Sequence, residues 1–188
     1  VPDTQELHDP FEGQRDLREK LVRAVGVAGD RMREDRLRAL RAIRFAARFS
    51  FAIERETWEA IEESAPHLGR LSMERVQQEI EKTMAQVERP GDAFRLWRDS
   101  GAFAVLAPAL AQLSEVALAT LDRLPRATSA EEAHRTTNRL IALFLDVPPA
   151  QARDTLRELR FSNDRVRWIG DIVERWHALH EAIRGEMS

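Results

Sequence analysis

From about residue 30 almost to the C-terminus, apolar residues recur at helical spacing, and this periodicity limits the fold more than any other feature. Leu37, Leu40, Ile43 and Ala47 are three or four residues apart, which predicts a helix with one buried face. After residue 30, no segment alternates between apolar and polar residues as a half-buried strand does. The chain is therefore predicted to be all-α.

Capping residues, prolines and glycines divide this region into helices. Asp30 is the predicted N-cap of a long helix that ends near Phe49. Further helices are expected over residues 54–64, 72–87, 92–100, 103–107, 114–124, 129–145, 149–160 and 162–184. Residues 1–16 have no sustained period and are expected to be irregular, with at most one short strand, while residues 17–25 fit a strand or a short helix.

Three parts are expected along the chain. Residues 1–29 are read as a connector, residues 30–124 as a first helical domain and residues 125–188 as a second one. The segment 123–130 contains Pro125 and two hydroxyl residues, which favours a boundary there.

Charge is unevenly distributed along the 188 residues. The net charge is −3, yet residues 12–48 hold eleven Arg or Lys against six acids. A basic patch on an acidic body attracts phosphate without making the whole protein bind polyanions. A solvated helix face is the alternative explanation of the same charges.

Composition excludes several other classes of protein. The chain has no cysteine, so disulfides, thiolate catalysis and cysteine zinc sites are ruled out. It has no apolar run of about 18 residues and no signal peptide, so no membrane partner and a cytoplasmic location are expected.

Within the predicted long helix, Asp35 and Glu34 both lie about one turn from Arg38. A carboxylate only accepts hydrogen bonds and a guanidinium only donates them. Cytosine and adenine both present an amino donor beside a ring-nitrogen acceptor, whereas uracil and guanine present a carbonyl oxygen and an N–H. The pair of Asp35 and Arg38 could thus accept C and A and reject U and G. The alternative is an ordinary exposed helix pair, which contributes about 0.2–0.5 kcal/mol.

Three segments, in order, resemble motifs of class II tRNA nucleotidyltransferases and the related bacterial poly(A) polymerases. Residues 34–38 (Glu-Asp-Arg-Leu-Arg), with Arg-Phe-Ala at 44–46, resemble the nucleotide-selecting motif. Residues 9–17 resemble the Asp-Pro-Phe-Gly-Gly-x-x-Asp-Leu hinge between head and neck, with Glu12 in place of the first glycine. Residues 72–76, with Glu79 and Lys82, resemble the neck motif that braces the nucleotide pocket.

The resemblance implies a helical neck and body and gives roles to individual residues. Asp35 and Arg38 would pair with the incoming base, Glu34 would hold Arg38, and Arg41 and Arg44 would contact the nucleotide or its phosphates. Glu74 and Arg75 would support this site from behind. The hinge would be formed by Asp9, Pro10, Gly13 and Asp16.

The resemblance also implies the function of the parent protein. The parent protein would be an enzyme that adds C or A, or both, to the tRNA 3′ end, with CTP and ATP as substrates and no DNA partner. This chain would be its nucleotide-selecting and tRNA-binding part. The family binds catalytic Mg2+ in a head domain, on a Gly-Ser and Asp-x-Asp motif that this sequence lacks. We therefore expect neck and body without the head, with no metal ligand or catalytic residue of its own and no activity alone. A fragment of a bacterial poly(A) polymerase and a non-catalytic helical RNA-binding module are the alternatives.

Overall fold

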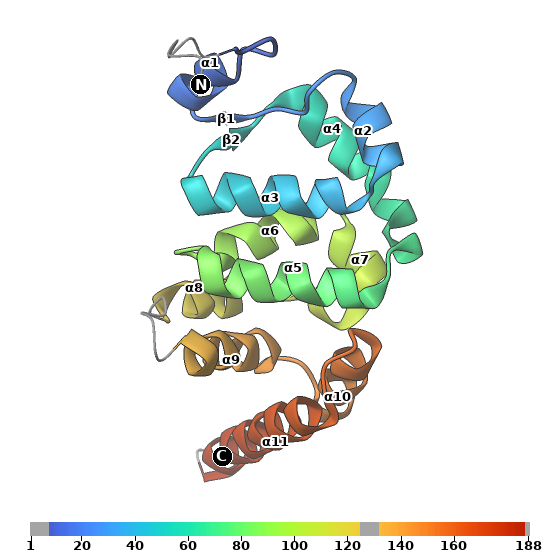
Figure 1. The fold of residues 1–188 in the computed structure, drawn as a ribbon. Helices are drawn as coiled ribbons and strands as arrows, with labels where there is room; N and C mark the ends of the chain where they lie inside the picture. The colour runs from blue at the N-terminus through green and yellow to red at the C-terminus, as the bar shows by residue number, and fades with distance from the viewer. Residues whose placement is uncertain (1–7, 125–131, 187–188) are drawn as a thin grey trace.

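A computed structural model describes residues 8–124 and 132–186 of the chain. Its helices stack one on another from the N-terminal to the C-terminal end of an elongated body (Figure 1), so the predicted all-α class is confirmed. The α-helices are α1 Gly13–Glu19, α2 Ala28–Glu34, α3 Leu37–Phe49, α4 Arg55–Ser64, α5 Met73–Gln86, α6 Pro90–Asp99, α7 Ala102–Leu106, α8 Glu115–Arg123, α9 Glu132–Phe144, α10 Pro149–Glu158 and α11 Asn163–Glu186. Two 3-10 helices, η1 Ala65–Arg70 and η2 Pro108–Leu110, complete the helical part.

The prediction of one long helix from Asp30 to Phe49 is wrong, because the helix is interrupted at residues 35 and 36, between α2 and α3. Asp35 has extended backbone angles (φ −146°, ψ 101°), and its side chain accepts a hydrogen bond from the Leu37 amide at 3.1 Å. Short polar side chains that bond to the backbone two residues on compete with the helical conformation in this way. Asp30 consequently lies in the first turn of α2, where Val27 is the N-cap.

A short strand pair joins the N-terminal segment to the end of α3. Strand β1 (Leu21–Val22) runs parallel to β2 (Ala52–Ile53), with Leu21 opposite Ala52. The expectation of no strand after residue 30 is thus wrong at β2, because two residues are too few to show alternation. The pair places residues 21–25 alongside α3.

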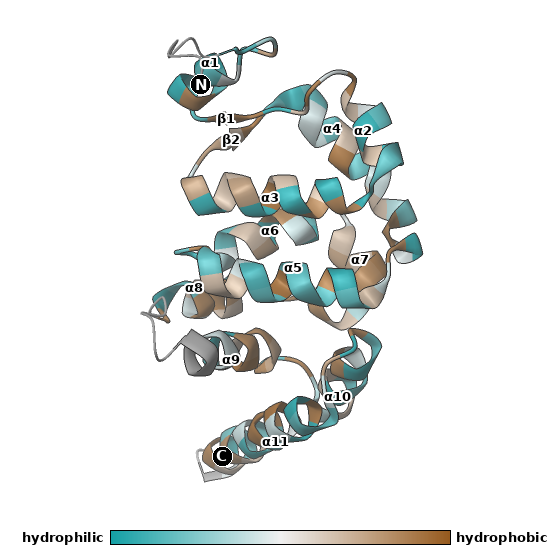
Figure 2. Ribbon diagram, viewed as in Figure 1, coloured by the Kyte–Doolittle hydropathy of each residue, from teal (hydrophilic) through white to brown (hydrophobic). Residues whose placement is uncertain are grey.

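One apolar core runs through the stacked helices. Leu40 and Ile43 of α3 are fully buried and belong to the same cluster as Ile80 of α5 and Phe94 of α6. Hydrophilic and hydrophobic residues are interspersed along each helix (Figure 2), as expected where one face of the helix is buried and the other is exposed. None of the described helices is both long and apolar enough to cross a membrane.

A buried arginine joins the later helices to the earlier ones. Nη1 of Arg139, in α9, donates to the carbonyl oxygens of Met84 and Val87 at 2.7 and 2.9 Å. Its Nη2 donates to those of Glu88 and Leu124 at 3.0 and 2.9 Å. These carbonyls lie at the C-terminal ends of α5 and α8, where a cation is favourable. The domain boundary expected at residue 125 lies outside the described residues.

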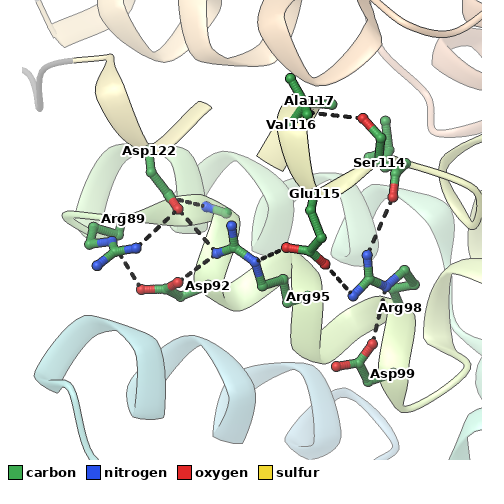
Figure 3. Close-up of polar contacts among 12 residues, drawn as sticks. Arg89, Asp92, Arg95, Arg98, Asp99, Ser114, Glu115, Val116, Ala117 and Asp122 are labelled. Carbon is green, nitrogen blue, oxygen red and sulfur yellow. Dashed lines mark hydrogen bonds and ion pairs between the residues drawn. The ribbon is translucent and has the colours of Figure 1, made fainter. Parts of the chain in front are cut away.

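The start of α6 lies against α8 through polar contacts (Figure 3). The Gly91 amide donates to Asp122 Oδ1 at 2.6 Å, and Arg95 joins Asp122 and Glu115 at 3.1 and 2.8 Å. A Cβ added to Gly91 would lie 2.4 Å from the Leu118 carbonyl oxygen. Glycine is therefore the residue that permits this close approach.

Candidate functional site

A cavity of about 500 Å³ opens between residues 22–25, α2 and α3. Its apolar lining comes mainly from Val22, Val25, Met32, Ala42 and Phe45, and its cationic lining from Arg23, Arg31, Arg38 and Arg41. Such a cavity suits a planar ring with attached anionic groups, because the apolar residues can cover the ring while guanidinium groups bind phosphate.

Glu34 holds two of the cavity's arginines. Its carboxylate accepts hydrogen bonds from Arg38 Nη1 at 2.9 Å and from Arg31 Nη1 at 3.0 Å. The hydrogen bond from Arg31, together with the charges of Arg31 and Arg38, keeps the pKa of Glu34 below its usual value. An ionised Glu34 at neutral pH therefore fixes both guanidinium groups beside the cavity.

Asp35 is not itself among the residues that line this cavity, but it lies next to Arg41, which does. Both of its oxygens accept from Arg75 Nη2 at 3.0 Å, and Oδ2 is 3.9 Å from Arg41 Nη1. Partial burial acts to raise the pKa of Asp35, but the Leu37 amide, Arg75 and Arg41 together lower it. No hydrogen bond joins the Asp35 and Arg38 side chains among the described residues, because the break before α3 separates them.

Arg44 lies away from the cavity, in the interface between α3 and α5. It is 6% exposed, and its Nε donates to Glu79 Oε2 at 2.8 Å. Glu79 is fully buried and also lies 3.7 Å from Arg41 Nε. Each step of three residues turns a helix by about 300°, so the row of Arg38, Arg41 and Arg44 rotates from the cavity toward α5. This position suits a bracing role better than the expected contact with a nucleotide.

Glu74 and Arg75 were both expected to support the site, but only Arg75 contacts Asp35. Arg75 bonds directly to Asp35, as described above, and so connects α5 with the break between α2 and α3. Glu74 is exposed and lies 3.7 Å from Arg160, at the end of α10. No motif in the sequence pointed to Arg31 or to the wall formed by residues 22–25, because only the parallel strand pair brings that wall to α3.

The hinge motif forms a capped turn before α1. Pro10 follows Asp9 in a turn closed by a bond from the Glu12 amide to the Asp9 carbonyl at 3.4 Å. The Asp9 carboxylate accepts from the amides of Gln14 and Gly13 at 2.9 and 2.7 Å, and these bonds lower its pKa. Asp16 pairs with Arg23 at 2.8 Å, which ties α1 to the wall of the cavity.

Glu12 adopts the left-handed backbone conformation that glycine favours, with φ 58° and ψ 30°. We therefore expect Glu12→Gly to raise the free energy of unfolding by about 0.5–1 kcal/mol, because glycine carries no Cβ penalty there. Urea denaturation followed by circular dichroism measures the change. Glu19→Gly, in the same helix, should instead destabilise the protein, and equal shifts of the two variants would contradict the argument.

Comparison with known proteins agrees with this fold. A family model described as the probable RNA and SrmB-binding site of polymerase A matches residues 50–113. The chain is 38% identical to the CCA-adding enzyme of Geobacillus kaustophilus, over 88% of this chain and 39% of the relative. It is 34% identical to the CCA-adding enzyme of Latilactobacillus sakei, over 86% of this chain and 39% of that relative. The chain thus spans less than half the length of these curated relatives.

Solved structures contain the same arrangement of helices. The CCA-adding enzyme of Bacillus stearothermophilus in complex with CTP superposes with a TM-score of 0.65 at 29% identity, over 91% of this chain and 42% of that one. A tRNA nucleotidyltransferase complexed with a primer tRNA and an incoming ATP analog reaches a TM-score of 0.75 at 21% identity, over 100% of this chain and 55% of that one, which supports the fold alone.

The fold and these relatives place the chain with the helical parts of proteins of the polymerase A and CCA-adding type. Within this class, the chain belongs to the family of class II tRNA nucleotidyltransferases, the CCA-adding enzymes, and bacterial poly(A) polymerases.

Proposed function

We propose that this chain is the nucleotide-selecting and tRNA-binding part of an enzyme that adds C, A or both to the tRNA 3′ end. The observation that carries the proposal is the position of Arg38, held by Glu34 beside a cavity with an apolar lining. Curated relatives at 38% and 34% identity are CCA-adding enzymes, and a crystal structure at 29% identity holds CTP. CTP and ATP are the proposed substrates, the tRNA 3′ end is the proposed partner, and the cytoplasm is the proposed location.

Asp35 retains the hydrogen-bonding capacity that base recognition needs. A carboxylate has about four acceptor positions. Within the part of the chain that the structure describes, Oδ2 accepts one hydrogen bond, from Arg75, whereas Oδ1 accepts two, from Arg75 and the Leu37 amide. Oδ2 can therefore accept the amino group of cytosine or adenine, while Arg38 donates to the adjacent ring nitrogen. Uracil and guanine would place an acceptor against the carboxylate and a donor against the guanidinium.

Arg41 and Arg44 are proposed to act at different distances from the nucleotide. Arg41 lines the cavity and lies near both Asp35 and Glu79, so it can balance the negative charge of a bound triphosphate. Arg44, bonded to Glu79, would hold α3 against α5 and keep Arg41 in place.

Nucleotidyl transfer uses Mg2+ held by carboxylates. In residues 8–124 and 132–186, no group of three or more His, Cys, Asp or Glu could hold a metal ion. The described side chains therefore do not fit this ion, and we derive no step through it. In the parent enzyme, a head domain outside this chain would supply the ligands.

A bacterial poly(A) polymerase is the second candidate, favoured by the polymerase A description of the family model at residues 50–113. Such an enzyme would select adenine alone. A non-catalytic helical RNA-binding module would bind RNA without preference among free nucleotides.

Isothermal titration calorimetry of the full-length enzyme with CTP, ATP, UTP and GTP tests the proposal. We expect CTP and ATP to bind at least about tenfold more tightly than UTP and GTP, and Asp35→Ala to abolish most of that preference, because a buried polar contact is worth roughly 1–3 kcal/mol. Asp30→Ala is the matched control, since Asp30 is also in this region but pairs with the exposed Arg33.

Three results separate the candidates. Unchanged discrimination in Asp35→Ala would refute the proposed role of Asp35. Binding of ATP alone by the unmodified protein would favour the poly(A) polymerase. No preference at all in the unmodified protein would favour the RNA-binding module.

A further inference from the structure

Three phenylalanine rings form an aromatic row at the C-terminal end of α3, which we define as the exposed Phe45 and Phe49 and the half-buried Phe51. Phe45 and Phe49 are 40% and 51% exposed. Their ring centroids are 6.2 Å apart with an angle of 12° between the planes, and the Phe49 and Phe51 centroids are 5.7 Å apart. Large exposed rings grouped in this way are unusual on a protein surface unless they bind something.

The backbone at the end of α3 builds the aromatic row. Phe45 and Phe49 are four residues apart and so lie on one face of the helix. Ser50 then adopts a left-handed conformation, with φ 54°, and the Phe51 amide donates to the Ala46 carbonyl at 2.9 Å. This helix-ending motif turns the chain back and brings the third ring beside the second.

Cationic side chains accompany the rings. The guanidinium carbon of the exposed Arg48 is 5.3 Å from the Phe49 centroid. Arg44 also lies against a ring, 4.5 Å from the Phe45 centroid, but it is buried in its pair with Glu79 and so is not available to phosphate. Aromatic faces beside an exposed cation suit single-stranded nucleic acid, because bases stack on the rings while the cation attracts a phosphate.

The aromatic row continues from the candidate nucleotide cavity, since Phe45 lines that cavity and Phe49 and Phe51 lie beyond it. We propose that the row is a stacking platform for the unpaired 3′ nucleotides of the RNA that receives the new nucleotide. This inference rests on the proposed function and assigns a position to its second substrate. Bases that stack on Phe49 and Phe51 would lead the RNA end toward the cavity.

Fluorescence anisotropy with a labelled single-stranded RNA of about eight nucleotides tests the platform. Phe49→Ala removes an exposed ring that does not line the cavity, and we expect it to weaken RNA binding roughly 5- to 100-fold, with an unchanged slope against salt concentration. Phe49→Trp should restore binding, whereas Phe49→Leu should not, because leucine is apolar but offers no ring face. Trp168→Ala, on the distant α11, is the control of similar exposure at 47%.

Calorimetric titration of Phe49→Ala with CTP separates this inference from the proposed function. The platform predicts normal CTP binding by Phe49→Ala together with weakened RNA binding. Equal RNA affinity of Phe49→Ala and the unmodified chain, or no RNA binding by the unmodified chain, would overturn the platform. If Phe49→Leu binds the RNA as tightly as the unmodified chain does, base stacking on this ring is overturned. The row would then be interpreted as an apolar docking surface for a protein domain. Absence of any nucleotide preference in the unmodified protein would overturn the proposed function instead.

Discussion

Replacing Glu79 by alanine should lower the free energy of unfolding by about 3–5 kcal/mol, because removing one partner leaves a buried charge uncompensated. Glu79 is fully buried, and its carboxylate is 2.8 Å from Arg44, which is 6% exposed. Arg41 and Lys82 lie 3.7 and 3.4 Å from the same carboxylate, so three cations lose their common partner. Urea denaturation followed by circular dichroism measures the loss.

Two comparisons distinguish a buried ion pair from a general loss of packing. The double variant Arg44→Met with Glu79→Leu should recover most of the stability, because apolar residues of similar volume often replace a buried pair without cost. Glu59→Ala breaks the Arg55 pair, which has the same 2.8 Å distance but is exposed, and should leave the transition unchanged. A similar effect of Glu59→Ala and Glu79→Ala would contradict the expected role of burial.

Gly91→Ala is the second substitution with a large expected effect, a loss of about 2–4 kcal/mol in the free energy of unfolding. The new methyl group would lie 2.4 Å from the Leu118 carbonyl oxygen and 2.7 Å from both oxygens of Asp122. The Leu118 carbonyl belongs to the backbone of α8 and cannot rotate away, so α6 and α8 would have to separate. Thermal denaturation should show a decrease of roughly 4–16 °C in Tm for a chain of this size.

Gly185→Ala is the matched control for Gly91→Ala, since nothing lies within 4 Å of a Cβ at that position of α11. It should be neutral or slightly stabilising, because alanine favours a helix more than glycine does. A loss of the same size in Gly185→Ala, or none in Gly91→Ala, would contradict the proposed close approach of α6 and α8.

Local patterns were sufficient to predict most helices but not the break that shapes the site. The stripe of Leu37, Leu40 and Ile43 predicts α3 correctly, and the structure buries all three residues. The residues next to Asp35 in the sequence are compatible both with a helix that continues through Asp35 and with one that ends there, so local sequence does not predict the interruption. Its extended conformation accompanies a hydrogen bond to the Leu37 amide and two to Arg75, forty residues away, and a helical pattern contains no information on such a partner.

The wall of the cavity illustrates a second limit. Residues 21–25 are mostly apolar, but five residues are too few for their pattern to specify what they pack against. Their position depends on the pairing of Leu21 with Ala52 across thirty-one residues, and a pair of two-residue strands has no signature in sequence. By contrast, the importance of Glu79 was indicated by its place in the neck motif, although its complete burial was not.

The four backbone carbonyls that accept hydrogen bonds from Arg139 have a consequence for synthesis of the chain. The bond from Arg139 to the Met84 carbonyl spans 55 residues, so the end of α5 leaves the ribosome long before α9 does. Until then, water must satisfy those carbonyls, and α5 lacks the cation at its C-terminal end. The helix that supplies Arg75 and Glu79 to the site can therefore reach its final stability only after translation has passed Arg139.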